Sequence, residues 1–429
     1  MNLVQLTPGA GRMYCGNCLR DNALVRMLRQ QGHTVTMVPL YLPLTLDEAD
    51  ESAATPIFFS GVNVYLDQKL PWFRSAPEWV RKWFTGRGLL GGVGRFAART
   101  RAEKAGDLAL SMLRGEAGNQ ARDLEELVGW LRTQPAPDAF CLSNALLLGM
   151  AHGLKAAFNA PVLCLLAGED AFLDAMPARL RDQAWQLMAE QARHVDRFLA
   201  PTRYFADRMT ERLRLDPDRI SVLPGGVSLE GLDESAPVAL PTPTIGFLAR
   251  MCRDKGLDTL VEAYILLRRR NRVPEARLKV GGSCGPTDEP LVNELKAKLH
   301  AAGFRGETSF HPNLSRDDKI AFLRSLSVFS VPALYGEAFG LYLVEALAAG
   351  VPVVQPRHAA FPEIIEITGG GVLCEPGSPE SLAEALESLL LDEPRRRAMA
   401  AAASQAVRRE FSSERTAAGL LSVIEGLRR

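Results

Sequence analysis

The chain alternates short aliphatic or β-branched segments with longer segments of helical periodicity, and it does so twice. In the first half the short segments are residues 3–6, 34–38, 139–142, 161–165, 198–200 and 220–223. In the second half they are residues 244–248, 278–281, 308–311, 328–331 and 351–355. Strands that are separated by helices pair in parallel, because a parallel crossover needs a long return connection. The sequence therefore predicts an α/β protein with two doubly wound parallel sheets, each in a Rossmann-like domain.

A proline-rich segment separates the two halves. Pro237, Pro241 and Pro243 lie within seven residues, which favours a stiff linker over a helix or a central strand. We therefore expect a first domain over residues 1–235 and a second over residues 244–411. Residues 412–429 have the pattern of a further amphipathic helix, which we expect to pack back on the first domain.

The bulk composition excludes several classes of protein. The chain has 429 residues, of which 47% are hydrophobic, so two sizeable cores can form. Its 50 basic and 50 acidic side chains cancel, and nothing global indicates nucleic acid as a partner. The seven cysteines are odd in number and scattered, which is typical of free thiols in a reducing compartment. With no signal-peptide pattern and no apolar run of about 18 residues, we expect a cytoplasmic protein.

Residues 71–105 depart from the alternating plan. Eight basic side chains there face only two acids, Glu78 and Glu103, and aromatic residues are interleaved with them. Trp79, Trp83 and Phe84 share one predicted helix face. This segment is interpreted either as a weak contact with the inner, anionic face of a membrane or with a lipid-linked acceptor, or as a helix pair that covers the first domain.

Residues 335–350 carry the most informative motif. They follow a predicted strand and open a helix that stops at Gly350. Gly340 lets a ligand approach the backbone, and the free amides of the first helical turn can bind phosphate. Glu337 lies just outside this helix and Glu345 inside it, and carboxylates are good acceptors for sugar hydroxyls. The alternative is that Glu337 is a favourable charge at a helix N-terminus and Glu345 a surface residue.

Two cations follow the first strand of the second domain. Arg250 ends that strand, and Lys255 precedes Gly256 and a new helix. Both are predicted at the carboxyl end of the sheet, where ligands bind in such folds, and two cations suit a diphosphate. The alternative is a solvated pair of loop charges.

Taken together, these segments resemble the family-four retaining glycosyltransferases, also described as glycosyl transferases group 1, which have the GT-B fold. The resemblance rests on Glu337 and Glu345 with seven residues between them, on the Arg250 to Lys255-Gly256 loop, and on residues 346–354 and 362–364. It implies two facing Rossmann-like domains, of which the first binds the acceptor and the second a nucleotide diphosphate sugar.

The resemblance also implies residue roles. Arg250 and Lys255 hold the donor diphosphate, Glu337 contacts the transferred sugar, and Glu345 holds the ribose of the nucleotide. The backbone around Gly340 assists at the diphosphate. Further donor-binding candidates are Phe339, Leu341, Glu363 and, in the glycine-containing loop of the first domain, Gly11.

One position departs from the family. After the strand at 161–165, the family often has a histidine, whereas this chain has Glu169 and Asp170. Either a carboxylate faces the reacting sugar, or the two acids cap a helix.

No motif requires a metal or another cofactor. Cys15 and Cys18 lack a second pair of cysteines to complete a zinc site, and no nucleophile motif lies beside any of the six histidines. The sequence thus predicts a retaining glycosyltransferase that moves a sugar to a carbohydrate, lipid-linked or small-molecule acceptor without a metal. The alternatives are a nucleotide-sugar epimerase, a sugar phosphorylase, or a non-catalytic scaffold of the same fold.

Overall fold

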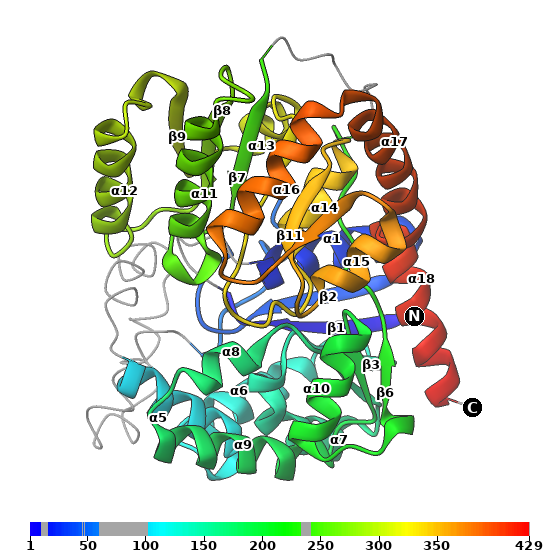
Figure 1. The fold of residues 1–429 in the computed structure, drawn as a ribbon. Coiled ribbons are helices and arrows are strands. Elements are labelled where there is room, and N and C mark those ends of the chain that lie inside the picture. Colours follow the sequence, from blue (N-terminus) through cyan, green and yellow to red (C-terminus); the bar gives the residue numbers. More distant parts are fainter. Residues whose placement is uncertain (10–15, 45, 47, 60–101, 233–241, 429) are drawn as a thin grey trace. The chain divides into compact units, whose positions relative to one another are not determined.

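The computed structural model describes residues 1–9, 16–44, 46, 48–59, 102–232 and 242–428. The chain forms two compact units. Unit 1 comprises Met1–Gly226 and Thr416–Arg429, and unit 2 comprises Val227–Arg415. Each unit contains one six-stranded sheet (Figure 1).

The sheet of unit 1 is parallel throughout and has the order β2-β1-β3-β4-β5-β6. Its strands are β1 (Asn2–Thr7), β2 (Thr34–Pro39), β3 (Ala139–Leu142), β4 (Val162–Leu165), β5 (Arg197–Ala200) and β6 (Ile220–Val222). Its helices include α1 (Gly16–Gln30), α5 (Ala102–Leu113), α6 (Ala121–Leu131), α7 (Ala151–Phe158), α8 (Glu169–Asp174), α9 (Ala178–Ala192) and α10 (Arg203–Leu213). Helices connect successive strands, as the sequence predicts.

The sheet of unit 2 is also parallel, with the order β12-β11-β10-β7-β8-β9. Its strands are β7 (Thr244–Leu248), β8 (Arg277–Gly282), β9 (Thr308–Pro312), β10 (Val328–Phe329), β11 (Val353–Pro356) and β12 (Gly371–Cys374). Its helices include α11 (Leu257–Arg270), α12 (Glu289–Ala301), α13 (Arg316–Arg324), α14 (Leu341–Ala348), α15 (Phe361–Thr368), α16 (Pro379–Leu391) and α17 (Glu393–Glu410). The strand order reverses between β7 and β10, so the loops that follow these two strands meet at the carboxyl edge of the sheet.

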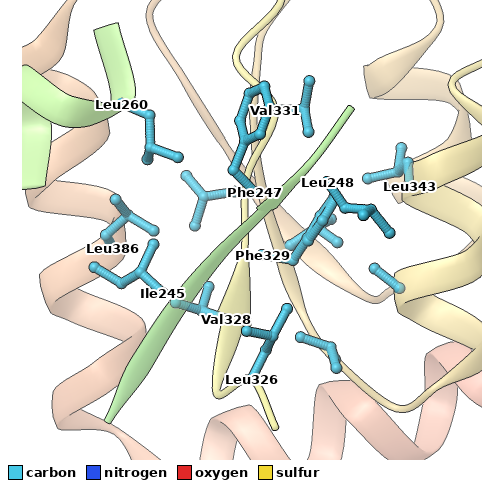
Figure 2. Packing of buried hydrophobic residues seen from close by; sticks show 14 of the residues in the cluster. Ile245, Phe247, Leu248, Leu260, Leu326, Val328, Phe329, Val331, Leu343 and Leu386 are labelled. Carbon is cyan, nitrogen blue, oxygen red and sulfur yellow. The ribbon is translucent and has the colours of Figure 1, made fainter. Parts of the chain in front are cut away.

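Strand β7 is apolar on both sides because it lies at the centre of this sheet. Ile245 and Phe247 lie on the side of the strand that carries Leu260 of α11 and Leu386 of α16, as Figure 2 shows. The next residue, Leu248, lies on the other side. A strand that is buried on both faces is apolar along its length and does not alternate with polar residues. This explains why all five residues of Thr244–Leu248 are buried and none is charged.

The C-terminal helix α18 (Ser413–Arg428) begins beside an isolated parallel bridge between Val227 and Ser412. Its Leu420 and Ile424 are fully buried and belong to the hydrophobic cluster of unit 1 that contains Leu3 of β1. The last part of the chain therefore completes the core of the unit in which the chain begins.

The predicted strands all coincide with observed strands, with bounds that differ by at most two residues. The sequence analysis missed β12, a short strand that begins at a glycine. The predicted limit at 235 falls within residues 233–241, which are outside the described residues, and the limit at 244 follows them. The structure divides the units between Gly226 and Val227, and again between Arg415 and Thr416, where the sequence predicts a limit after residue 411.

Most of the basic aromatic segment 71–105 also lies outside the described residues, and its two interpretations stay predictions. Only the backbone of its last residues is described, where α5 begins at Ala102. In the parts of the chain that the structure describes, no helix is both long and apolar enough to cross a bilayer.

Candidate functional site

The loops after β7 and β10 are tied together at the carboxyl edge of unit 2. The loop after β7 contains the 3-10 helix η5 (Arg253–Lys255) and ends at Gly256, whose φ of 70° is in the left-handed region. A Cβ atom on Gly256 would lie 1.9 Å from the carbonyl oxygen of Pro332, which follows β10. The amide of Leu334 donates to the carbonyl oxygen of Asp254 over 2.9 Å. A glycine is therefore required where the two loops touch.

Lys255 and Glu337 form an ion pair between these loops. Lys255 Nζ lies 2.6 Å from Glu337 Oε2, and the two side chains are 18% and 14% exposed. The hydroxyl groups of Tyr335 and Tyr342 donate to the same oxygen over 3.0 and 2.8 Å. Lys255 also donates to the Tyr335 hydroxyl, and its Nζ lies 4.8 and 4.9 Å from the ring centroids of Tyr335 and Tyr342. The ammonium group is thus held by a carboxylate and two aromatic faces.

The surroundings of Glu337 keep it ionised. Burial alone would raise the pKa of Glu337, but the charge of Lys255 and the hydrogen bonds from Lys255, Tyr342 and Tyr335 outweigh burial and lower it. Burial and the nearby Glu337 raise the pKa of both tyrosines, so they remain hydrogen-bond donors. Glu337 is therefore an acceptor and not an acid at neutral pH.

Arg250 is held by a carboxylate that the sequence analysis did not identify. Its Nε lies 3.1 Å from both oxygens of Asp288, and its Nη2 lies 2.9 Å from Asp288 Oδ1. The Arg250 side chain is 57% exposed, whereas Asp288 is 7% exposed. The amide of Gly285 donates to Asp288 Oδ2 over 3.1 Å and fixes the carboxylate. One edge of the guanidinium is thus anchored, and more than half of the Arg250 side chain stays open to solvent.

Helix α14 begins at this edge, and its N-terminus has no side-chain cap hydrogen bond. Its N-cap Gly340 has φ 82°, and the amides of Leu343 and Val344 donate to the Gly340 carbonyl. The amides of Leu341 and Tyr342 precede these bonds, and such first-turn amides favour anions. Phe339 is 9% exposed, and its ring centroid lies 5.8 Å from that of Phe411. Its contact with the donor stays a prediction.

Glu345 lies further along α14 and forms a second half-buried ion pair. Its Oε1 lies 2.8 Å from Lys319 Nζ of α13, and the two side chains are 16% and 15% exposed. Glu363 lies in the first turn of α15 and is half-buried.

In unit 1, Glu169 and Asp170 begin helix α8 and are buried. Glu169 accepts hydrogen bonds from the amides of Ala145 and Ala167 over 2.6 and 3.0 Å. Burial raises the pKa of Glu169, although these amides oppose the effect. Asp170 pairs with Arg208. Both carboxylates bind groups of their own unit, but the N-cap of α8 is Gly168 and no side chain makes a cap hydrogen bond there. A contact of either carboxylate with a sugar stays a prediction. Gly11 lies outside the described residues.

The sequence analysis missed four residues that contact the predicted site residues, namely Tyr335, Tyr342, Asp288 and Lys319. The tyrosines lie two residues before and five residues after Glu337, within the motif that was recognised. Their hydroxyl groups are possible donors to a nearby carboxylate, but the sequence does not show that they reach Glu337. Asp288 is 38 residues from Arg250, and only the folded structure pairs them. In the described ranges, no group of three or more His, Cys, Asp or Glu residues is arranged to hold a metal ion.

Two family models together match most of the chain. Residues 232–406 match the model described as glycosyl transferases group 1, and residues 95–230 match the model described as glycosyltransferase family 4. The chain is 30% identical over 330 residues to a D-inositol 3-phosphate glycosyltransferase of Nocardiopsis dassonvillei, covering 73% of each chain. It is 34% identical to the enzyme of the same name from Xylanimonas cellulosilytica, covering 53% of this chain and 56% of that relative. The match thus spans just over half the length of the Xylanimonas relative.

Solved structures share the fold at low sequence identity. Sucrose-phosphate synthase from Thermosynechococcus elongatus superposes with a TM-score of 0.70 at 16% identity, covering 99% of this chain and 98% of that chain. Anabaena HepE in complex with UDP has a TM-score of 0.69 at 13% identity, covering 99% of this chain and 100% of that chain. The fold is therefore the GT-B fold, with two Rossmann-like units.

The fold, together with an alignment to a glycosyltransferase over 73% of the chain, identifies this chain as a glycosyltransferase. It belongs to the glycosyl transferases group 1 family, the family-four retaining glycosyltransferases.

Proposed function

We propose that this chain transfers a sugar from a nucleoside diphosphate sugar to an acceptor with retention of configuration, and that unit 2 binds the donor. The observation that supports this most directly is the convergence of Arg250, Lys255, Glu337 and the start of α14 where the strand order reverses between β7 and β10. Cations and free amides suit a diphosphate, and an ionised carboxylate suits sugar hydroxyls.

The leaving nucleoside diphosphate gains negative charge as the glycosidic bond breaks. In this proposal the exposed part of the Arg250 guanidinium, the Lys255 ammonium and the first-turn amides of α14 stabilise that charge. Glu337 accepts a hydrogen bond from a hydroxyl of the transferred sugar, and Glu345 accepts from the ribose. Lys319 neutralises Glu345 and holds it in place over 2.8 Å.

The nucleotide to test first is UDP. Anabaena HepE was solved with UDP and with UDP-glucose, and its fold is similar along the whole chain. The curated relatives are named for inositol 3-phosphate, so that compound belongs in the first panel of acceptors.

Transfer is proposed to need no divalent ion, because Arg250, Lys255 and the helix amides already supply positive charge to the leaving group. Activity in excess chelator should stay close to that of the untreated enzyme. Loss of activity on chelation and its return with magnesium or manganese would contradict this account.

Single substitutions test the separate roles. Arg250→Ala and Lys255→Ala should lower turnover by on the order of a hundredfold, because they meet charge that develops in the transition state. Glu345→Gln should raise the donor KM by roughly tenfold or more with little change in kcat, because the ribose contact is the same in ground and transition states. Glu337→Gln should lower kcat and leave UDP affinity nearly unchanged.

Steady-state kinetics and UDP calorimetry on each variant, with folding checked by thermal melting, measure these effects. Equal loss of UDP affinity in Glu337→Gln and Glu345→Gln would contradict the division of roles. A wild-type chain that binds no nucleoside diphosphate would be a non-catalytic scaffold.

A further inference from the structure

All the hydrogen bonds that the described residues donate to the Glu337 carboxylate end on one of its two oxygens. Oε2 accepts from Lys255 over 2.6 Å, from Tyr335 over 3.0 Å and from Tyr342 over 2.8 Å. No described residue donates to Oε1. A carboxylate has about four acceptor positions in all, so three donors saturate Oε2. Oε1 is therefore the oxygen that remains available to a ligand.

The two tyrosine hydroxyls are held in place by their rings. Tyr342 lies in the first turn of α14, and its ring centroid is 6.3 Å from that of the fully buried Phe329 of β10. The rings of Tyr335 and Tyr342 also contact the Lys255 ammonium at 4.8 and 4.9 Å. The donors thus come from two segments, the loop after β10 and helix α14, and both meet the same carboxylate oxygen.

We propose that Tyr335 and Tyr342 are positioning residues for the transferred sugar: their hydroxyls hold Oε2 of Glu337 so that Oε1 accepts from one sugar hydroxyl. This inference rests on the function proposed above and adds to it two residues with no role in the sequence motif. It assigns the tyrosines no direct contact with the donor.

The physical consequence is a carboxylate that needs no rearrangement when the sugar gains positive charge. A hydroxyl on a sugar with an oxocarbenium-like transition state becomes a stronger donor, so its bond to Oε1 strengthens as the reaction proceeds. A carboxylate free to rotate would lose part of this gain. The tyrosine hydroxyls should therefore affect turnover and leave nucleotide affinity unchanged.

The test uses Tyr342→Phe and Tyr335→Phe in the full chain, because phenylalanine keeps the ring that faces Lys255 and removes only the hydroxyl. Hydrolysis of UDP-glucose, with water as the acceptor, and calorimetric UDP affinity are measured for each variant. We expect kcat to fall roughly tenfold in each variant, which corresponds to one hydrogen bond to a charged group, and UDP affinity to change less than about twofold.

Tyr264→Phe is the matched control. Tyr264 is fully buried in α11 of the same unit, and its hydroxyl donates to the Ala276 carbonyl over 2.9 Å. This variant also loses one buried tyrosine hydroxyl, so it should show any general effect on folding while its kcat stays at the wild-type value.

The decisive arm is Tyr342→Phe combined with Glu337→Gln. If Tyr342 acts through Glu337, its substitution should change kcat less than about twofold once the carboxylate is gone. A tenfold effect that persists in the Glu337→Gln background, or kcat of Tyr342→Phe equal to that of Tyr264→Phe, would overturn the positioning role alone. A wild-type chain that neither binds UDP nor turns over any nucleotide sugar would overturn the proposed function, and this inference with it.

Discussion

At the scale of single residues, each cation predicted to hold the diphosphate is already paired with a carboxylate. Arg250 binds Asp288 and Lys255 binds Glu337, so the four charges cancel in pairs. The pairs are not equivalent, because Arg250 is 57% exposed and Lys255 is 18% exposed. Arg250 can therefore meet an incoming diphosphate without leaving Asp288. Lys255, in addition to its proposed contact with the diphosphate, holds the Glu337 carboxylate in place over 2.6 Å.

The Glu337 ion pair predicts a pH dependence of stability. The pKa of Glu337 is lowered from 4.5 in the folded chain, so the stabilisation is complete above 4.5 and is lost as the pH falls through the folded-state pKa. Glu337→Gln should cost about 2 kcal/mol of unfolding free energy near neutral pH, because it leaves Lys255 without its counter-charge.

Denaturant unfolding of the wild type and of Glu337→Gln at several acidic pH values measures the difference in their free energies of unfolding. The advantage of the wild type should shrink below pH 4.5. A wild-type advantage that is constant with pH would contradict the ion-pair account.

At the scale of elements, two glycines with left-handed backbone conformations shape the loops of the candidate site, and different constraints act on them. Gly256, between η5 and α11, combines a left-handed φ of 70° with a backbone oxygen 1.9 Å from any added Cβ. Gly340, at the start of α14, has φ 82°, but the nearest atom to an added Cβ is 3.4 Å away on Phe361. The first position is limited by backbone conformation and by space, and the second by conformation alone.

Substitution by alanine should therefore lower the free energy of unfolding by different amounts at these two positions. Gly340→Ala should lower the free energy of unfolding by about 1–2 kcal/mol, the cost of a left-handed conformation for a residue with a Cβ. Gly256→Ala should cost roughly 3 kcal/mol or more, because the loop must also move away from Pro332. Thermal melting of both variants gives the comparison, and equal midpoints would show that the two loops do not touch as described.

At the scale of the whole molecule, the chain ends in the unit where it begins. Ala417, Leu420 and Ile424 of α18 are fully buried in the cluster of unit 1. Arg428 pairs with Asp138 of the same unit over 2.9 Å. Unit 1 thus depends on residues more than 400 positions from its first strand.

Leu420→Ala should destabilise unit 1 by about 2–5 kcal/mol, the usual cost of removing a fully buried leucine side chain. Amide hydrogen exchange should become faster in β1 and β2, whose Leu3, Val35 and Met37 share the cluster with Leu420. Exchange in β7 and β8 of unit 2 should change little. Faster exchange confined to unit 2 would contradict the assignment of α18 to the core of unit 1.

The sequence by itself determined the fold class and the family. Parallel strands need buried apolar runs and intervening helices, and both leave local patterns such as residues 244–248 that can be read without the structure. The spacing of Glu337 and Glu345 is also local, because one strand-to-helix segment carries both residues. Helix α18 was predicted for the same reason, from its own periodicity.

Only the tertiary structure decided which charges meet. Asp288 reaches Arg250 across 38 residues, and Lys255 reaches Glu337 across 82 residues, because the strand order brings the ends of β7, β8 and β10 together. Hydrogen bonds and ion pairs act over a few ångströms, and their partners are set by sheet order, which no local pattern encodes. For the same reason, the saturation of Glu337 Oε2 by two tyrosines and a lysine became visible only in the folded chain.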